Sequence, residues 1–345
     1  MNKLRRFLLD VPVINIVSIE NNVSDRGVEI DVVVRVRGAG RRRTLVCGVK
    51  GNGQPRHVRM ALVQLRDATS RAGDGAIPIF IAPYLSPVAR DLCRAERVGY
   101  LDFHGNARLV FDGVFIDRAV PGKPPAEQRN LRSIFSPKAA QVLRLMLRDP
   151  RRAWRVNKLA EAAGVSLGHA SNVRKALLGR EWAEEVPEGV VLGDPDALLD
   201  AWRDVYAPSR GERMGFYTTL HGVGLEDAAR GVLQAGAGAT SVVFASYSAA
   251  RWLAPHVRAG ADFFYTSEEG LPRLQEALHL SPVAQGENVF VTVPKYDGVF
   301  ADCIEPAPGI VCTSAVQTYL DIGATGERGQ EAAEHLRRER LTWRT

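Results

Sequence analysis

The spacing of apolar and polar residues divides the chain into three blocks. In the first block, residues 1–119, strand-like runs at Val28–Arg37 and Thr44–Lys50 precede a helix-like run at Arg56–Arg71. In the last block, residues 206–345, short apolar strands again alternate with amphipathic helices. Because strands that alternate with helices are typical of sheets covered by helices, both blocks are predicted to be α/β domains, and the whole chain a multi-domain α+β protein.

The same patterns predict further elements on either side of the central block. In the first block these are strands at Ile77–Ala82, Gly99–Phe103 and Ala107–Phe111 and a helix at Ser86–Arg97. In the last block they are strands at Ser241–Phe244, Asp262–Tyr265, Val289–Val293 and Ile310–Cys312, and helices at Leu225–Gln234, Ser246–Leu253, Leu271–Leu278, Ser314–Ile322 and Arg328–Glu339. Residues 120–130 are rich in proline and polar residues and are predicted to be a linker.

The central block, residues 131–205, has the element order of a winged helix-turn-helix. A first helix is predicted at Ser136–Arg148, with proline at its first position. The segment Val156–Trp182 is predicted to form two helices joined by a turn at Gly164, where glycine can take the left-handed conformation that ends a helix. A short hairpin follows, and then a connecting helix over Asp194–Val205. In such a unit the second helix fits the major groove of DNA.

The second of these helices has one apolar face and one face of small and hydrogen-bonding residues. Ala170, Val173 and Leu177 have the spacing of a buried stripe. The other face lacks acidic residues and is flanked by arginines, so we predict that it contacts the bases and phosphates of double-stranded DNA. The predicted DNA-binding residues are Arg155, Ser166, Gly168, His169, Ser171, Asn172, Arg174 and Lys175. Three helices with a hairpin also occur as protein-binding or structural modules, and this alternative stays open.

Composition and length indicate a folded protein of several domains. The chain has 345 residues, which is longer than a domain with a single hydrophobic core usually is. Of these residues, 46% are hydrophobic and 24% are charged. No apolar run approaches the ~20 residues that span a bilayer, and no secretory signal is expected at the N-terminus. The four cysteines include no C-x-x-C pair, which predicts reduced thiols in a cytoplasmic protein and no zinc site. The net charge of +6 is compatible with nucleic acid as a partner.

The order of elements in the first block resembles the PD-(D/E)XK nuclease fold. That family uses two carboxylates to hold Mg²⁺ and a lysine to position water or stabilise developing charge. Asp31, Lys50 and Gln54 match its pattern, but Gly48 stands where the second carboxylate belongs. Glu29 lies two residues from Asp31 on the same strand face and could substitute for that carboxylate. The resemblance implies a nuclease-like domain that has lost hydrolysis; in an active nuclease, Glu29, Asp31, Lys50 and Gln54 would form the site and Mg²⁺ would be the cofactor.

The last block contains two segments that resemble the AbiEi family, the antitoxins and transcriptional regulators of type IV toxin–antitoxin systems. They are Ser314–Asp321, with the pattern S-x-x-Q-T-Y-L-D, and Gly326–Gly329 with the helix that follows it. With the winged helix, the resemblance extends from about residue 131 to the C-terminus. It implies a bacterial cytoplasmic repressor that binds inverted repeats upstream of its own operon and antagonises a toxin of nucleotidyltransferase type. It implies neither catalysis nor a cofactor.

Two other functions stay open. The chain could be a metal-dependent DNA endonuclease that its winged helix targets to DNA, or a non-catalytic scaffold for protein interactions. Nucleotidyl transfer is not predicted, because no pair of aspartates two residues apart follows Ser246 or Ser248. A second copy of the chain, or basic surface from the flanking domains, is expected to add to the DNA affinity, because a single DNA-binding module buries a limited interface.

Overall fold

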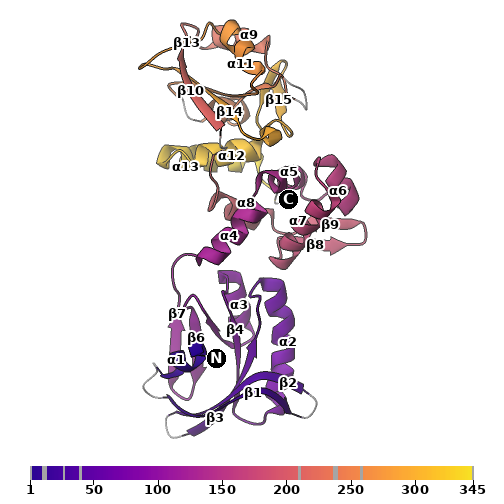
Figure 1. Ribbon diagram of the computed structural model, residues 1–345, viewed down its shortest axis with the longest axis vertical. Coiled ribbons are helices and arrows are strands. Elements are labelled where there is room, and N and C mark those ends of the chain that lie inside the picture. The colour runs from indigo at the N-terminus through magenta and orange to yellow at the C-terminus, as the bar shows by residue number, and fades with distance from the viewer. Residues whose placement is uncertain are drawn as a thin grey trace. The chain divides into compact units, whose positions relative to one another are not determined.

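The computed structural model of the protein describes residues 2–9, 14–25, 28–38, 41–208, 211–235, 240–256 and 259–343. The chain forms two compact units, one of residues 1–130 with 175–181 and one of residues 131–174 with 182–345. Each contains helices and sheet (Figure 1), which confirms the multi-domain α+β prediction. None of the described helices is long and apolar enough to cross a membrane. The finer division at residues 119, 130 and 205 stays a prediction.

The first unit is built on a seven-stranded sheet with its strands in chain order, β1 to β7. Pairs β3–β4 and β4–β5 are parallel and the others are antiparallel. Helices α2 and α3 cover one face, where Val58 and Leu65 pack with Val46 and Phe80, while Leu8 of α1 belongs to the core on the other face. The bounds are α1 Asn2–Leu9, β1 Ile14–Asp25, β2 Val28–Gly38, β3 Arg41–Val49, α2 Pro55–Arg71, β4 Ala76–Ala82, α3 Pro87–Ala95, β5 Gly99–Asp102, β6 Ala107–Phe111, β7 Val114–Arg118 and α4 Pro125–Ile134.

The predicted elements of the first block are confirmed, with their ends shifted by a few residues. Three elements were not predicted from the apolar pattern, namely α1, β1 and β7. Among the described strands, β1 pairs with β2 alone, and its sequence INIVSIENNVSD mixes polar with apolar residues, as an edge strand can. Helix α4 begins at Pro125, so much of the segment that we predicted to be a linker is helical.

The central segment forms the predicted elements in the predicted order, three helices and then a two-stranded antiparallel sheet. Met146 of the first helix, Leu159 of the second and Val173 of the third are all buried. Val190 of the hairpin bridges back to Trp154, which ties the hairpin to the residues before the second helix. The bounds are α5 Pro137–Arg148, α6 Val156–Ala162, α7 Leu167–Gly179, β8 Ala183–Val186, β9 Gly189–Leu192 and α8 Pro195–Arg203.

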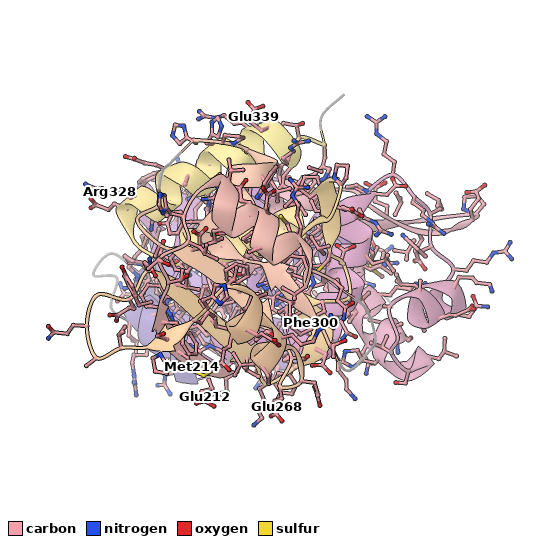
Figure 2. The ribbon with its side chains drawn as sticks, turned by 90° about the horizontal axis from the view of Figure 1, so that it is seen from above. Glu212, Met214, Glu268, Phe300, Arg328 and Glu339 are labelled. Atoms are coloured by element: carbon pink, nitrogen blue, oxygen red, sulfur yellow. The ribbon has the colours of Figure 1, made fainter. Side chains whose placement is uncertain are left out.

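The C-terminal segment is a second seven-stranded sheet, in the order β13-β10-β14-β12-β11-β16-β15. Helices α9 and α11 pack on one face, and α12 and α13 lie on the other (Figure 1). Seen from above in Figure 2, Arg328 and Glu339 of α13 lie on the side opposite Glu212 and Met214 of β10. The bounds are β10 Gly211–Tyr217, α9 Val223–Arg230, β11 Val242–Phe244, α10 Ser246–Leu253, β12 Asp262–Thr266, α11 Gly270–Ala277, β13 Ser281–Pro282, β14 Val289–Pro294, η1 Asp297–Val299, β15 Ile304–Ala307, β16 Ile310–Cys312, α12 Ala315–Gly323 and α13 Glu327–Arg340.

Candidate nucleic-acid interface

The turn between α6 and α7 is set by a glycine and a serine. Gly164 has φ +62°, and nothing lies within 4 Å of the Cβ that another residue would place there. The backbone conformation, and not a lack of space, therefore favours glycine. Ser166 caps α7, because its Oγ accepts a hydrogen bond of 3.3 Å from the backbone N–H of His169. Ala170 and Val173 are buried at 0% and 4% exposure, which confirms the predicted apolar stripe.

The same turn, Gly164–Gly168, matches the G-x-S-x-G pattern of hydrolase nucleophiles. In a hydrolase that pattern follows a strand and presents the serine at a strained turn. Here it joins two helices, and the hydroxyl of Ser166 is engaged as a helix cap. Ser166 in this pattern therefore caps a helix, and the match does not indicate a nucleophile.

Much of the predicted DNA-binding set lies on an exposed face of α7. Gly168, Asn172 and Lys175 are exposed, and their spacing of four and three residues places them on one side of the helix. Ser171 beside them is half-buried. Leu167 at the start of the helix lies outside the apolar stripe and is 57% exposed. An exposed aliphatic group among polar ones can contact a thymine methyl.

Three other predicted residues have different surroundings. Arg155 is exposed just before α6. His169 is half-buried, and its Nε2 is a buried atom without a hydrogen-bond partner among the described residues. Arg174 donates a hydrogen bond to Glu185 of β8, so its charge is partly neutralised within the unit. These contacts leave Asn172 and Lys175 as the best exposed polar groups of α7.

The hairpin after α7 is acidic. Glu184 and Glu185 of β8 and Glu188 in the turn are all exposed. Because DNA phosphates repel carboxylates, this hairpin is unsuited to contact the DNA backbone. The basic residues lie instead before α6, where Arg152 stacks over the ring of Trp154 at 3.8 Å. The arrangement favours contact through α7 and the segment before α6.

Three positions that match the nuclease pattern, Asp31, Gly48 and Lys50, lie close together in the first unit, but Gly48 has no side chain. Strands β2 and β3 pair Val32 with Cys47, so the next step of the register places Asp31 opposite Gly48. One oxygen of Asp31, Oδ2, accepts from the Lys50 ammonium at 3.1 Å and from the backbone N–H of Val49 at 2.7 Å. A Cβ at Gly48 would meet only the Leu65 side chain, at 3.6 Å, so space does not exclude a larger residue.

The other two residues predicted for that site are Gln54 and Glu29. Gln54 precedes α2 and its amide donates to the Glu127 carboxylate of α4 at 3.4 Å. The side chain of Glu29 lies outside the described residues, so its role as a substitute carboxylate stays a prediction. Within the described part of the chain, no group of three or more His, Cys, Asp or Glu residues could hold a metal ion.

The segment Ser314–Asp321 forms α12, which is largely buried in the second unit. Ser314 caps it, with Oγ accepting from Gln317 N–H at 3.2 Å. Asp321 accepts hydrogen bonds from Tyr206 at 2.5 Å, Gln317 at 3.0 Å and Tyr265 at 3.2 Å. Burial raises the pKa of Asp321 to about 6, although these three donors oppose the shift. The segment is therefore part of the core and not an exposed binding motif.

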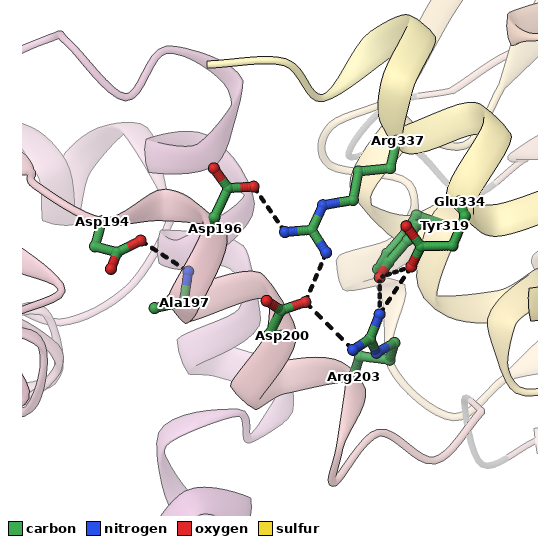
Figure 3. Close-up of polar contacts among 8 residues, drawn as sticks. All are labelled: Asp194, Asp196, Ala197, Asp200, Arg203, Tyr319, Glu334 and Arg337. Atoms are coloured by element: carbon green, nitrogen blue, oxygen red, sulfur yellow. Dashed lines mark hydrogen bonds and ion pairs between the residues drawn. The ribbon is translucent and has the colours of Figure 1, made fainter. Parts of the chain in front are cut away.

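Charged contacts join α8, which follows the hairpin, to α12 and α13 (Figure 3). Arg337 of α13 donates to Asp200 and Asp196 of α8, each at 2.6 Å. Arg203 at the end of α8 donates to the Tyr319 hydroxyl at 2.8 Å and to Glu334 at 2.9 Å. These contacts hold α8 against α12 and α13, and sequence periodicity did not point to them.

A family model matches part of the second unit. Residues 191–342 match the family described as "Transcriptional regulator, AbiEi antitoxin, Type IV TA system". No curated protein matches the chain. A solved structure described as "Structure of EndoMS in apo form" is 18% identical with a TM-score of 0.22, over 30% of this chain and 45% of that one, so the match spans less than half of its length. The part of the chain from the hairpin to the C-terminal helix is thus similar to AbiEi antitoxins, transcriptional regulators of type IV toxin–antitoxin systems.

Proposed function

We propose that the protein is a DNA-binding transcriptional regulator that represses its own operon and acts as the antitoxin of a type IV toxin–antitoxin system. The observation that carries the proposal is the exposed, acid-free face of α7 with Asn172 and Lys175, in a helix-turn-helix followed directly by the AbiEi-like residues 191–342. Gly168 in the first turn of α7 is exposed and has no side chain, so a DNA backbone can approach the helix closely at that position.

Each residue of the face has a distinct part in the proposal. Asn172 would read a base edge, because an asparagine amide can donate to and accept from adenine. Lys175 and Arg155 would contact phosphates, which adds affinity without sequence preference. The acidic hairpin would remain outside the DNA interface. No catalytic step is part of the proposal.

The test is fluorescence anisotropy with the full chain and DNA from upstream of its own gene. Asn172→Ala should weaken binding to the specific site by about 1–3 kcal/mol and leave binding to unrelated DNA nearly unchanged. Lys175→Ala should weaken binding to both and reduce the salt slope by about 1. Arg328→Ala is the matched control, because it removes an exposed cation from α13, away from the predicted face.

Wild-type affinity in the double variant Asn172→Ala with Lys175→Ala would refute the assignment of the face. The antitoxin part has a separate test, co-expression with a nucleotidyltransferase encoded beside the gene. Restored growth supports that part, and continued toxicity with intact DNA binding would leave a regulator that is not an antitoxin.

A further inference from the structure

The end of β2 and the start of β3 in the first unit present basic and polar side chains on an open face of the sheet. Residues that pair directly across neighbouring strands share a face, and β1, β2 and β3 give two such rows here. The two rows, called the arginine rows below, are Asn15, Arg37 and Arg42 in one and Ser18, Arg35 and Thr44 in the other. Further along the same face, Val33 and Val46 pack in the core beneath α2. All three arginines are exposed, so this end of the face is open to solvent.

Two of these arginines stand directly opposite each other. Arg37 pairs with Arg42 across the ladder of β2 and β3, and side chains in such a position have Cβ atoms ~4.5–5.5 Å apart. Like charges at that distance destabilise a sheet. Among the described residues, neither arginine forms an ion pair. The fold therefore gains nothing from this pair of charges, and an anion bound beside them would offset their repulsion.

The carboxylates near the arginine rows do not neutralise them. Glu20 of β1 accepts a hydrogen bond from Arg35, and Asp112 accepts one from Arg43 at 2.7 Å. Asp74 is exposed in the turn before β4. Against these three carboxylates the same end of β2 and β3 carries five arginines, an excess of two positive charges, namely Arg35, Arg37, Arg41, Arg42 and Arg43.

The arginine rows are separate from the positions that match the nuclease pattern. Asp31 lies near the start of β2 and Lys50 follows the end of β3, whereas Arg37 and Arg42 lie at the opposite ends of those strands. Arg37 follows Asp31 by six residues along β2, which is ~20 Å at ~3.3 Å per residue. The rows also belong to the first unit, whereas Asn172 belongs to the second. They therefore form a surface of their own.

The chemistry of the arginine rows matches a phosphate backbone. Arginine, asparagine, serine and threonine are among the residue types that donate hydrogen bonds to phosphate oxygens in DNA complexes. None of the six side chains is apolar, whereas protein–protein interfaces have an apolar core. None is aromatic either, whereas proteins hold single-stranded nucleic acid by stacking its bases on aromatic rings. The surface thus suits the backbone of a duplex better than a protein or a single strand.

We propose that the arginine rows bind the phosphate backbone of duplex DNA without sequence preference. Arg37 and Arg42 contact phosphates through charge-assisted hydrogen bonds, and Asn15 and Thr44 can donate further hydrogen bonds beside them. Such contacts add affinity for any duplex, because they release counterions from the DNA. The first unit thereby holds DNA through a surface that does not depend on α7.

Fluorescence anisotropy of the full chain with an unrelated duplex, over a range of salt concentrations, tests this surface. Arg37→Gln with Arg42→Gln should weaken binding and lower the salt slope by about 2, because each phosphate contact contributes about 1. Glutamine keeps a polar side chain in each position, so the double variant removes charge and little else.

The matched control is Arg66→Gln with Arg71→Gln. It removes the same two charges from the same unit, but these arginines lie on α2 and form ion pairs with Glu96 and Asp67. The control should therefore leave the salt slope nearly unchanged.

A third variant, Arg42→Glu, separates DNA binding from folding. It places a carboxylate opposite Arg37, and opposite charges in that position stabilise a sheet. The urea midpoint of the first unit, followed by circular dichroism, should rise while the affinity for the duplex falls. A fall in both would assign the two arginines to folding and overturn the proposal.

The proposal is also overturned if the double variant at Arg37 and Arg42 keeps the wild-type salt slope, or if the control lowers the slope equally. Polyglutamate that competes as strongly as DNA of equal charge would overturn the phosphate assignment in favour of an acidic protein partner. The unrelated duplex contains no operator. Failure to bind upstream DNA specifically would therefore contradict the proposed function and leave the result for the arginine rows intact.

Discussion

Asp321→Asn should make the second unit more stable at neutral pH. The Asp321 carboxyl is 5% exposed, and burial raises its pKa to about 6. Its neighbours suit a neutral group, because Tyr206 and Gln317 donate to Oδ1, and the Tyr265 hydroxyl near Oδ2 can also accept. An asparagine keeps the first two bonds and can donate its amide N–H to Tyr265. The substitution therefore removes the charge and keeps the hydrogen bonds.

The magnitude follows from the difference between the folded and unfolded pKa. An unfolded aspartate has a pKa of about 3.9, so the raised folded value penalises the ionised form by about 3 kcal/mol. The stabilisation by the neutral carboxyl is complete below the unfolded pKa and is lost as the pH rises through the folded pKa near 6. Between pH 4.5 and pH 7.5 the wild type should lose about 2 kcal/mol through this one group. In Asp321→Asn that loss should disappear.

Tryptophan fluorescence during urea unfolding measures this quantity in the second unit alone. The chain has 5 tryptophans, and every one of them lies in that unit. Asp227→Asn is the control, because that carboxyl is 67% exposed on α9 and its neutralisation should not alter the pH dependence. An Asp321→Asn protein that loses as much stability as the wild type between pH 4.5 and pH 7.5 would refute the proposed burial of this charge.

Three further substitutions test other parts of the structure. Gly164→Ala should lower the free energy of unfolding by about 1 kcal/mol, because φ is +62° at this residue. Gly179→Ala in α7 should leave that free energy unchanged or raise it. Equal effects of the two substitutions in urea unfolding would contradict the left-handed turn at Gly164. Arg337→Met should lower the free energy of unfolding by about 2 kcal/mol in the same assay, because it removes two hydrogen-bonded ion pairs with carboxylates from a side chain that is 16% exposed. An unchanged urea midpoint would show that these ion pairs contribute nothing to stability. Gly48→Glu should increase Mn²⁺ binding in calorimetry by placing a second carboxylate opposite Asp31, and titrations identical to the wild type would argue against a nuclease-like arrangement.

The sequence predicted the elements with strong local signals. The helices α6 and α7 could be predicted because Gly164 ends a helix, Ser166 caps the next one, and Ala170 and Val173 keep helical spacing. Strand β1 was missed because polar residues interrupt its apolar positions at the sheet edge, where only one neighbour supports it. Residues 120–130 are rich in proline, yet Pro125 begins α4, because proline is favoured in the first turn of a helix.

The candidate sites were less predictable, because they depend on contacts between distant residues. The sequence placed Arg174 on the DNA face, but its ion pair with Glu185 forms only when the hairpin folds back on α7. It likewise gave no sign that Arg144 of α5 meets Gln317, which lies 173 residues further along the chain. The S-x-x-Q-T-Y-L-D pattern identified the family resemblance, but only the structure shows that its glutamine and aspartate form a buried network.

The central proposal is that α7 contacts DNA. A footprint of the full chain on the DNA upstream of its own gene tests that contact. We expect protection of an inverted repeat, with Asn172→Ala losing discrimination at a base position in each half-site and Arg328→Ala giving the wild-type pattern. Absence of protection at low salt, or an identical footprint for Asn172→Ala, would contradict it.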